Sequence, residues 1–343
     1  MKKTMKKRTK DYIIAYFDIL GYKNIINNNL LNENEFIKII SEAVKQVIAL
    51  KSDGIWGNKH PQVYCFSDNF VICINYDKSK MVELIYNFAQ LAVVMQIIQY
   101  NWFVSYNLLI RGSIVIGELY LKNSFIYGQG LIDAYMLENT IAIYPRIVVQ
   151  EEIVSKIIRY CTEMNEDRIN NEGLIVNETN ILNTYFNFSM ERLLNDGMID
   201  ESFYREWYDN YSLTKILKDF DGIYFIDFLQ FAKRDYHETE EFSQEELWEI
   251  VKAINKNNME FYLKRFSDNY HVLKKLLWLC DYINDFYIRE DKDKIFKRNE
   301  LIISTHVNLE NISKFFLQTA LKKDTTQNEK KHLLKLVDII DNL

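Results

Sequence analysis

The sequence contains few residues of the kinds that break or cross-link a chain. Its 343 residues include only two prolines, ten glycines and four scattered cysteines, none of which forms a CxxC pair. The five histidines are dispersed and lack the spacing of zinc ligands. These absences argue against a disulfide-stapled secreted protein and against a zinc finger. We therefore expect reduced, buried cysteines and a cytoplasmic protein.

The chain also lacks an excess of positive charge. Its net charge is −6, which argues against broad nucleic-acid binding. The N-terminal basic residues are confined to residues 1–10, which we interpret as a solvated tail. The longest apolar stretch, Leu84 to Ile98, is interrupted by polar residues and is predicted to be a buried helix. The N-terminus has no signal-peptide pattern, so we expect neither a membrane nor a nucleic acid among the partners.

The length of the chain and the change in residue pattern along it predict two domains. Four of the ten glycines fall between Gly112 and Gly130, so tight turns and strands are expected mainly in the first half of the chain. After Glu151 the pattern changes, and the Asn-rich stretch 165–183 is predicted to be a loop. Helical periodicity with charged faces is found over 190–194, 245–266, 272–288 and 308–321. We predict an α+β domain over residues 11–160 and a mainly helical region over residues 161–343.

Local patterns in the first domain predict a definite order of elements. Strands are expected over 12–20, 107–120, 125–127 and 146–150, and helices over 33–50, 81–99 and 131–139. Two short apolar runs around Ser67-Asp68-Asn69 predict a β-hairpin. This order is typical of a mixed sheet with helices packed on one face.

Two aspartates stand out in this pattern. Asp18 lies inside the apolar run YIIAYFDILGY, where a buried carboxylate is costly unless it is paired or metal-bound. The alternative is that Asp18 caps the turn before Gly21. Asp68 lies at the hairpin tip, where aspartate is also ordinary turn chemistry. A sheet of this order can bring the two carboxylates side by side, where they would suit Mg²⁺ or Mn²⁺.

Together with two glycine-punctuated strings, these motifs resemble the class III nucleotide cyclases over about residues 11–155. FDILGY (17–22) and FSDNF (66–70) are similar to the two metal-aspartate motifs of that family. RGSIVIGE (111–118) and YGQGLIDAYMLE (127–138) are similar to its glycine strand and its helix entry, although such strings also suit turns and a helix start. The resemblance implies a ferredoxin-like palm, two metal ions, a nucleoside triphosphate substrate and a head-to-tail homodimer.

The resemblance also implies roles for individual residues. The Mg²⁺ or Mn²⁺ ligands would be Asp18, Ile19 and Asp68, with Asp18 and Asp68 as the catalytic pair. The substrate-binding residues would be Gly21, Tyr64, Phe125 and Arg111.

Several positions depart from the family pattern. The family's transition-state Asn and Arg fall on Ile132 and Met136, and neither side chain can hydrogen-bond a phosphate. Its base-reading Lys and Asp fall on Tyr64 and Phe125, two aromatics that could stack a base. Bacterial pyrimidine cyclases of antiphage systems also depart from the purine pattern, which favours a pyrimidine triphosphate and a role in phage defence.

Two hypotheses for the function remain open. The intact pair of Asp18 and Asp68 favours an enzyme, a metal-dependent cyclase or related nucleotidyltransferase. Ile132 and Met136 favour an inactive cyclase-like protein that binds a nucleotide or a partner.

Two further features also have two interpretations each. Arg111 and Arg146 are candidates to replace the missing arginine, or they form structural ion pairs at strand ends. The run DFDGIYFIDFL (219–229) is either a metal site or, as we favour, a segment that docks on the first domain.

Overall fold

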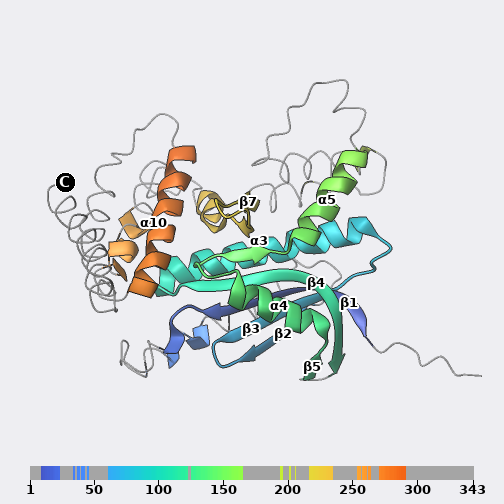
Figure 1. Cartoon of the computed structure of the whole chain (residues 1–343), viewed down its shortest axis with the longest axis horizontal. Coiled ribbons are helices and arrows are strands. Elements are labelled where there is room, and N and C mark those ends of the chain that lie inside the picture. The colour runs from blue at the N-terminus through green and yellow to red at the C-terminus, as the bar shows by residue number, and fades with distance from the viewer. Residues whose placement is uncertain are drawn as a thin grey trace, which may run out of the picture. The chain divides into compact units, whose positions relative to one another are not determined.

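The structure is a computed structural model that describes part of the chain (Figure 1). The continuous described segments are 9–23, 61–122, 125–164, 216–234 and 270–290, with single residues and short stretches within 34–45, 194–205 and 253–263. The chain divides into two compact units, residues 1–237 and residues 238–343.

Eight strands of the first unit form one mixed sheet. The strands are β1 (Lys10–Ile19), β2 (Gln62–Phe66), β3 (Asn69–Asn75), β4 (Ile110–Lys122), β5 (Phe125–Tyr127), β6 (Ile147–Val149), β7 (Ile216–Lys218) and β8 (Tyr224–Ile226). They lie in the order β2-β3-β1-β4-β6-β8-β7, and β5 pairs with β4. Only β4 and β6 are parallel among these pairs.

The first four long strands have the ferredoxin-like arrangement. Helix α3 (Met81–Tyr106) joins β3 to β4, and the described residues of the helix expected over 33–50 are helical. The resulting chain order is β-α-β-β-α-β, and the strands lie in the order β2-β3-β1-β4. The α+β class and the predicted β2–β3 hairpin are therefore confirmed.

Strand β1 lies between β3 and β4, and it is buried on both faces. Ile13 and Phe17 belong to the core on one face, and Ile14 and Tyr16 belong to the core on the other. All four are at most 5% exposed. The continuous apolar run of the sequence is typical of such a strand, whereas a strand with one wet face would alternate.

The helices consequently cover both faces of the sheet, as Figure 1 shows. Helices α3 and α5 (Glu151–Met164) pack on the face of Phe17. Helix α4 (Gln129–Thr140) packs on the opposite face, where Ala134 belongs to the core of Ile14 and Val115. The expectation of helices on one face holds for α3 and α5 but is wrong for α4. The reason is that apolar side chains on both faces of β1 both need a cover.

Helix α3 is the core helix predicted at Leu84 to Ile98. By length and composition alone it could cross a membrane, but 72% of its most apolar stretch is buried within the fold. Its polar residues are used internally. The side-chain amides of Gln96 and Gln99 donate to the backbone oxygens of Asp227 and Pro145. Such bonds remove much of the penalty for burying amides.

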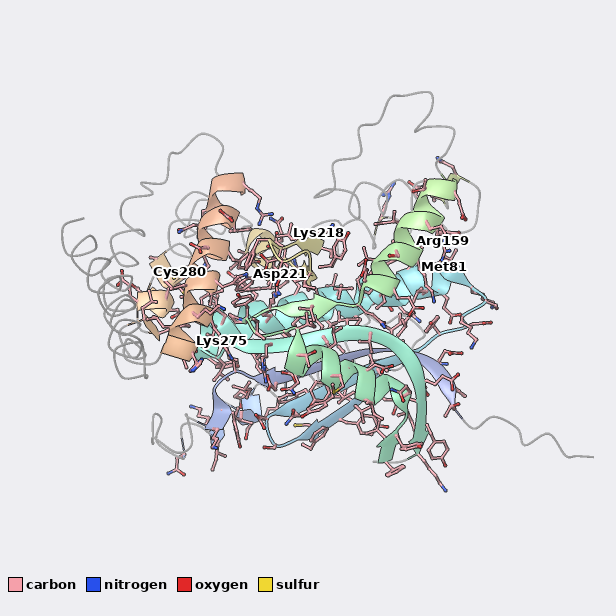
Figure 2. All side chains as sticks on the ribbon, viewed as in Figure 1. Met81, Arg159, Lys218, Asp221, Lys275 and Cys280 are labelled. Carbon is pink, nitrogen blue, oxygen red and sulfur yellow. The ribbon has the colours of Figure 1, made fainter. Side chains whose placement is uncertain are left out.

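Residues 216–234 return to the sheet of the first unit. Strand β8 pairs with β6, and the 3₁₀ helix η1 (Phe228–Arg234) packs against α3. The predicted docking of DFDGIYFIDFL is thus confirmed. Asp219 and Asp221 of the β7–β8 hairpin form ion pairs with the fully buried Arg146, and Figure 2 labels Asp221. The sheet therefore continues past residue 160, where we expected the first domain to end.

The described part of the second unit is helical. Helix α10 (Tyr270–Glu290) corresponds to the helical periodicity at 272–288, and its Leu279 and Phe286 are buried. Three other expectations lie outside the described residues: the tail over 1–8, the loop over 165–183 and the helix over 308–321. Lys10, the last residue of the expected tail, begins β1.

Candidate functional site

Asp18 is the penultimate residue of β1, just before the chain turns at Gly21. Its register partners are Asn69 on β3 and Arg111 on β4. Asp68 directly precedes Asn69, in the tight turn between β2 and β3. The register therefore brings Asp18 and Asp68 to the same end of the sheet, on neighbouring strands. We call this the acidic end.

Arg111 holds the Asp18 carboxylate with two hydrogen bonds. Its Nε donates to Oδ1 over 3.0 Å, and its Nη2 donates to Oδ2 over 3.1 Å. The same Nε lies 2.8 Å from Oε1 of Glu138, a residue of α4 whose side chain is only 3% exposed. An arginine between two largely buried carboxylates offsets part of their charge and fixes the orientation of Asp18.

Asp68 is reached by a short chain of hydrogen bonds. The Asn69 amide donates to Oδ1 of Asp68 over 3.2 Å, and the Tyr16 hydroxyl donates to Oδ1 of Asn69 over 2.5 Å. Ser67 takes a left-handed φ of 57° at the turn. Because Tyr16 and Asp18 are two residues apart on one strand, their side chains leave the same face of the sheet. The turn that carries Asp68 is thus tied to the face of Asp18.

The electrostatic potential at the acidic end is negative, and the pKa of Tyr16 reflects it. Burial raises the pKa of the Tyr16 hydroxyl above its usual 10.0. Three nearby carboxylates, Glu138, Asp18 and Asp68, raise it further because they disfavour a second negative charge. Burial alone would lower the pKa of Arg111, but the bonds and charges of Asp18 and Glu138 raise it on balance.

The donors at this end suit a divalent cation that arrives with its substrate. In the described parts of the chain, no three His, Cys, Asp or Glu side chains gather into a metal site. Carboxylate oxygens are what Mg²⁺ and Mn²⁺ prefer, and Mg²⁺ is often held by one or two carboxylates plus substrate phosphates. Both Asp18 oxygens bind Arg111, yet a carboxylate offers about four lone-pair sites. Asp18 and Asp68 therefore fit such an ion. The Ile19 side chain lies in the core on the opposite face, which leaves only its backbone carbonyl oxygen as a possible metal ligand.

The glycines of the motifs serve turns and close packing. Gly21 has a φ of 83°, which favours glycine at the turn after β1. A Cβ on Gly117 would lie 2.5 Å from the Cα of Gly130, so these two residues let α4 approach β4. Gly128 is also crowded, with a φ of 150° beside the carbonyl of Glu118. The two glycine strings are therefore accounted for by packing and by a helix start, without a phosphate.

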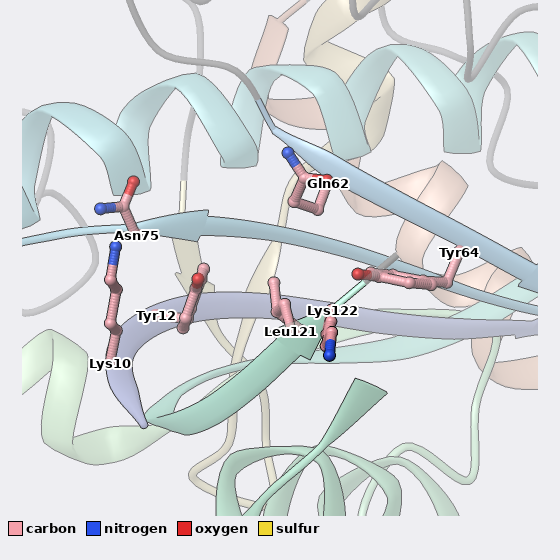
Figure 3. A pocket seen from close by; sticks show the side chains of 7 residues that line it. All are labelled: Lys10, Tyr12, Gln62, Tyr64, Asn75, Leu121 and Lys122. Atoms are coloured by element: carbon pink, nitrogen blue, oxygen red, sulfur yellow. The ribbon is translucent and has the colours of Figure 1, made fainter. Parts of the chain in front are cut away.

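Tyr64 and Phe125 lie in different surroundings. Phe125 is 59% exposed on β5 and stacks on Tyr127. Tyr64 is half-buried on β2, and burial raises the pKa of its hydroxyl. It lines a pocket of about 260 Å³ (Figure 3). The other lining residues are Lys10, Tyr12, Gln62, Asn75, Leu121 and Lys122. Phe125 does not line this pocket.

The residues at the family's transition-state positions face solvent. Ile132 and Met136 are 53% and 49% exposed on α4, while Ala134 and Glu138 of the same helix are buried toward the sheet. Neither candidate arginine takes their place, because Arg111 binds Asp18 and Glu138, and Arg146 binds the β7–β8 hairpin. Both arginines match the structural ion-pair interpretation.

The sequence arguments missed Glu138, Tyr16 and Asn69 as parts of this site. A signal for Glu138 was present, because it follows Ala134 by four residues and so shares its helix face. Tyr16 shares the face of Asp18 by strand alternation. Asn69 could have been found only from the register that places it opposite Asp18.

No protein-family model matches the chain, and no curated protein matches it either. Solved structures that are similar to part of it include three cyclases. The crystal structure of the adenylyl cyclase CyaB from P. aeruginosa shares 14% identity over 45% of this chain and 83% of that chain, with a TM-score of 0.34. The guanylyl cyclase Cya2 shares 10% identity over 43% and 78%, with a TM-score of 0.31. A bacterial light-regulated adenylyl cyclase shares 15% identity over 45% and 46%, with a TM-score of 0.30.

Proposed function

We propose that this protein is a metal-dependent nucleotide cyclase, or a related nucleotidyltransferase, that acts on a nucleoside triphosphate. One observation carries the proposal: Asp18 and Asp68 lie at the same end of the sheet, and Arg111 orients Asp18 with two hydrogen bonds. The resemblance of FDILGY and FSDNF to the cyclase metal motifs supports the same pair.

In this proposal Asp18, Asp68 and the carbonyl oxygen of Ile19 would hold Mg²⁺ or Mn²⁺. The ion would neutralise phosphate charge and lower the pKa of the attacking hydroxyl. Arg111 would keep Asp18 in one orientation, and the buried Glu138 would keep Arg111 in place. Groups that are already oriented need little reorganisation when charge develops on the phosphates.

An inactive, nucleotide-binding relative of the cyclases is the second candidate. The observation that favours it is the exposure of Ile132 and Met136 on α4, where the resemblance expects an Asn and an Arg. Neither side chain can donate a hydrogen bond to a phosphate. Loss of an arginine clamp can lower a phosphoryl-transfer rate by about 10³-fold or more.

The test is to incubate the full chain with each of ATP, GTP, CTP and UTP in the presence of Mn²⁺ and to look for a cyclised or transferred product. We expect Asp18→Asn to lower turnover by about 100-fold or more, because a bound ion supplies several kcal/mol of charge stabilisation. Asp11→Asn is the matched control, since Asp11 is also an ion-paired carboxylate of β1. A wild type as inactive as Asp18→Asn with all four nucleotides would favour the inactive candidate.

We further propose a homodimer formed through α4 and β5. Large apolar side chains gather on this side of the first unit and are 47–63% exposed: Phe125, Tyr127, Ile132, Tyr135 and Met136. Patches of this kind mark interaction sites in soluble domains. Met136→Glu should shift sedimentation toward the monomer, whereas Phe220→Glu, at a 78% exposed position on the β7–β8 hairpin, should not. A monomeric wild type at micromolar concentration would contradict this.

The substrate and pathway belong to the same proposal. Tyr64 in place of a base-reading lysine favours a pyrimidine triphosphate, since a tyrosine ring fills more space and leaves room for a smaller base. The product would be a cyclic nucleotide signal made in the cytoplasm. The resemblance to antiphage pyrimidine cyclases suggests phage defence as its setting.

A further inference from the structure

A pocket at the far end of β1 has a chemistry opposite to that of the acidic end. Lys10 begins β1, Gln62 begins β2, Asn75 ends β3 and Lys122 ends β4, so four strands bring their termini together there. We call this the basic pocket, with the seven lining residues named above. Lys10 and Asp18 are eight residue steps apart along β1, which corresponds to about 26 Å.

The lining of the basic pocket is cationic and rich in hydrogen-bond donors. Lys10 and Lys122 contribute two ammonium groups, and no carboxylate is among the seven lining residues. Neither lysine forms an ion pair with a carboxylate in the described part of the chain. The neighbouring Asp11 is already ion-paired with Lys78. Among the described residues around the pocket, none therefore compensates its positive charge.

Two phenol groups complete the lining. Tyr12 and Tyr64 lie on the same face of the sheet, and burial, followed by the neighbouring Cys73 thiol, raises the pKa of both hydroxyls. Burial, the larger cause, also keeps both hydroxyls protonated and able to donate. In Figure 3 the Tyr64 hydroxyl points toward the middle of the pocket, between Gln62 and Lys122.

We propose that the basic pocket binds the phosphate group of a small phosphorylated metabolite, of the size of a nucleoside monophosphate or smaller. Ammonium groups form strong charge-assisted hydrogen bonds to phosphate oxygens, and neutral hydroxyls add directional donors. The pocket volume of about 260 Å³ is just below the roughly 300–1,000 Å³ of sites for drug-sized ligands. A ligand with at most one phosphate and one nucleobase is therefore expected.

This inference does not depend on catalysis at the acidic end. The proposed choice of a base by Tyr64 requires only the ring and hydroxyl of that residue. The phosphate site requires Lys10 and Lys122, which base selection leaves unused. Binding without a metal ion is the distinguishing property, because the acidic end needs a cation to hold a phosphate.

The experiment is isothermal titration of the full chain at low salt with EDTA, using UMP, inorganic phosphate and uridine as separate ligands. UMP should bind, inorganic phosphate should bind more weakly, and uridine should give no measurable heat. The double variant Lys10→Gln, Lys122→Gln should weaken UMP binding by about 100-fold, or about tenfold for each lysine. Both lysines are exposed, so the variant should keep the circular dichroism of the wild type.

Lys78→Gln is the matched control, because Lys78 is an exposed lysine near the same strand end that is paired with Asp11. It should leave the UMP affinity within about twofold. Equal binding of uridine and UMP would overturn the phosphate site while leaving the proposed enzyme untouched. Unchanged UMP affinity in the double variant would also overturn it. Inactivity with all four triphosphates would instead count against the proposed enzyme and not against this pocket.

Discussion

The two ends of β1 carry opposite charges on one face of the sheet, and they are built differently. At the acidic end, Arg111 forms ion pairs with both Asp18 and Glu138, and the three side chains are at most 18% exposed. At the basic pocket, Lys10 and Lys122 are exposed and have no carboxylate partner among the described residues. The acidic end has an arginine within it that pairs with two of its carboxylates, whereas the lysines of the basic pocket are left to pair with a ligand.

This difference indicates which end the fold depends on. Breaking a largely buried ion pair leaves an uncompensated charge, which is strongly destabilising. Removing an exposed lysine changes stability little. The acidic end should therefore contribute to folding as well as to chemistry, whereas the basic pocket should contribute to binding alone.

The largest expected effect comes from removing Arg111. Arg111→Met should destabilise the protein by about 3–5 kcal/mol, because it leaves Asp18 and the buried Glu138 without their cation. Lys10→Gln should change stability by no more than about 0.5 kcal/mol. Urea unfolding of both variants measures the difference.

A second substitution tests the cause. Arg111→Met combined with Glu138→Gln should recover part of the lost stability, because it removes one of the two unpaired carboxylates. Equal stability of Arg111→Met and Lys10→Gln would erase the contrast between the two ends.

The strand pattern was predictable because its signals are local. The apolar run of β1 and the two runs around Ser67-Asp68-Asn69 predict a central strand and a hairpin, and both are found. The position of Asp18 and Asp68 at one end follows from that order. The pattern could not predict the face of the sheet on which α4 packs. Because β1 is apolar on both faces, neither face could be assigned to solvent.

The partners of the site residues depend on contacts between distant parts of the chain. Glu138 reaches Arg111 only because Gly117 and Gly130 allow α4 to approach β4 closely. Arg146 is held by Asp219 and Asp221, more than seventy residues away in sequence. The basic pocket likewise combines four strand termini, and no local motif marks it.

A second prediction compares the tyrosines of the two ends at alkaline pH. The pKa of Tyr16 in the folded protein is raised well above its usual 10.0, so its contribution to stability is complete below pH 10. Above pH 10 the unfolded chain loses this proton while the folded chain keeps it, and stability falls. The loss per tyrosine is at most about 1.4 kcal/mol for each pH unit.

Unfolding free energies between pH 8 and 11 should separate the two ends. Tyr16→Phe should flatten the alkaline decline more than Tyr64→Phe, because Tyr64 lacks the neighbouring carboxylates. Tyr16→Phe also loses the hydrogen bond to Asn69, so its stability at pH 8 should be lower. Identical slopes of unfolding free energy against pH for the two variants would show that the carboxylates of the acidic end do not raise the pKa of Tyr16.

The smallest expected effect is on the preference for one nucleotide base over another. It compares Tyr64, which lines the basic pocket, with Phe125, which does not. If the protein turns over nucleotides, UTP or CTP should be preferred in a competition with ATP and GTP. Tyr64→Phe removes one neutral hydroxyl that can bond a base edge, so it should weaken the preference by about threefold to tenfold. Tyr64→Lys introduces a longer, charged donor and should shift the preference toward a purine.

Phe125→Ala is the matched control, because Phe125 is exposed on β5 and lies outside the pocket that Tyr64 lines. An unchanged preference in both Tyr64 variants would defeat base selection by this residue, and a larger change in Phe125→Ala would place the base on β5 instead.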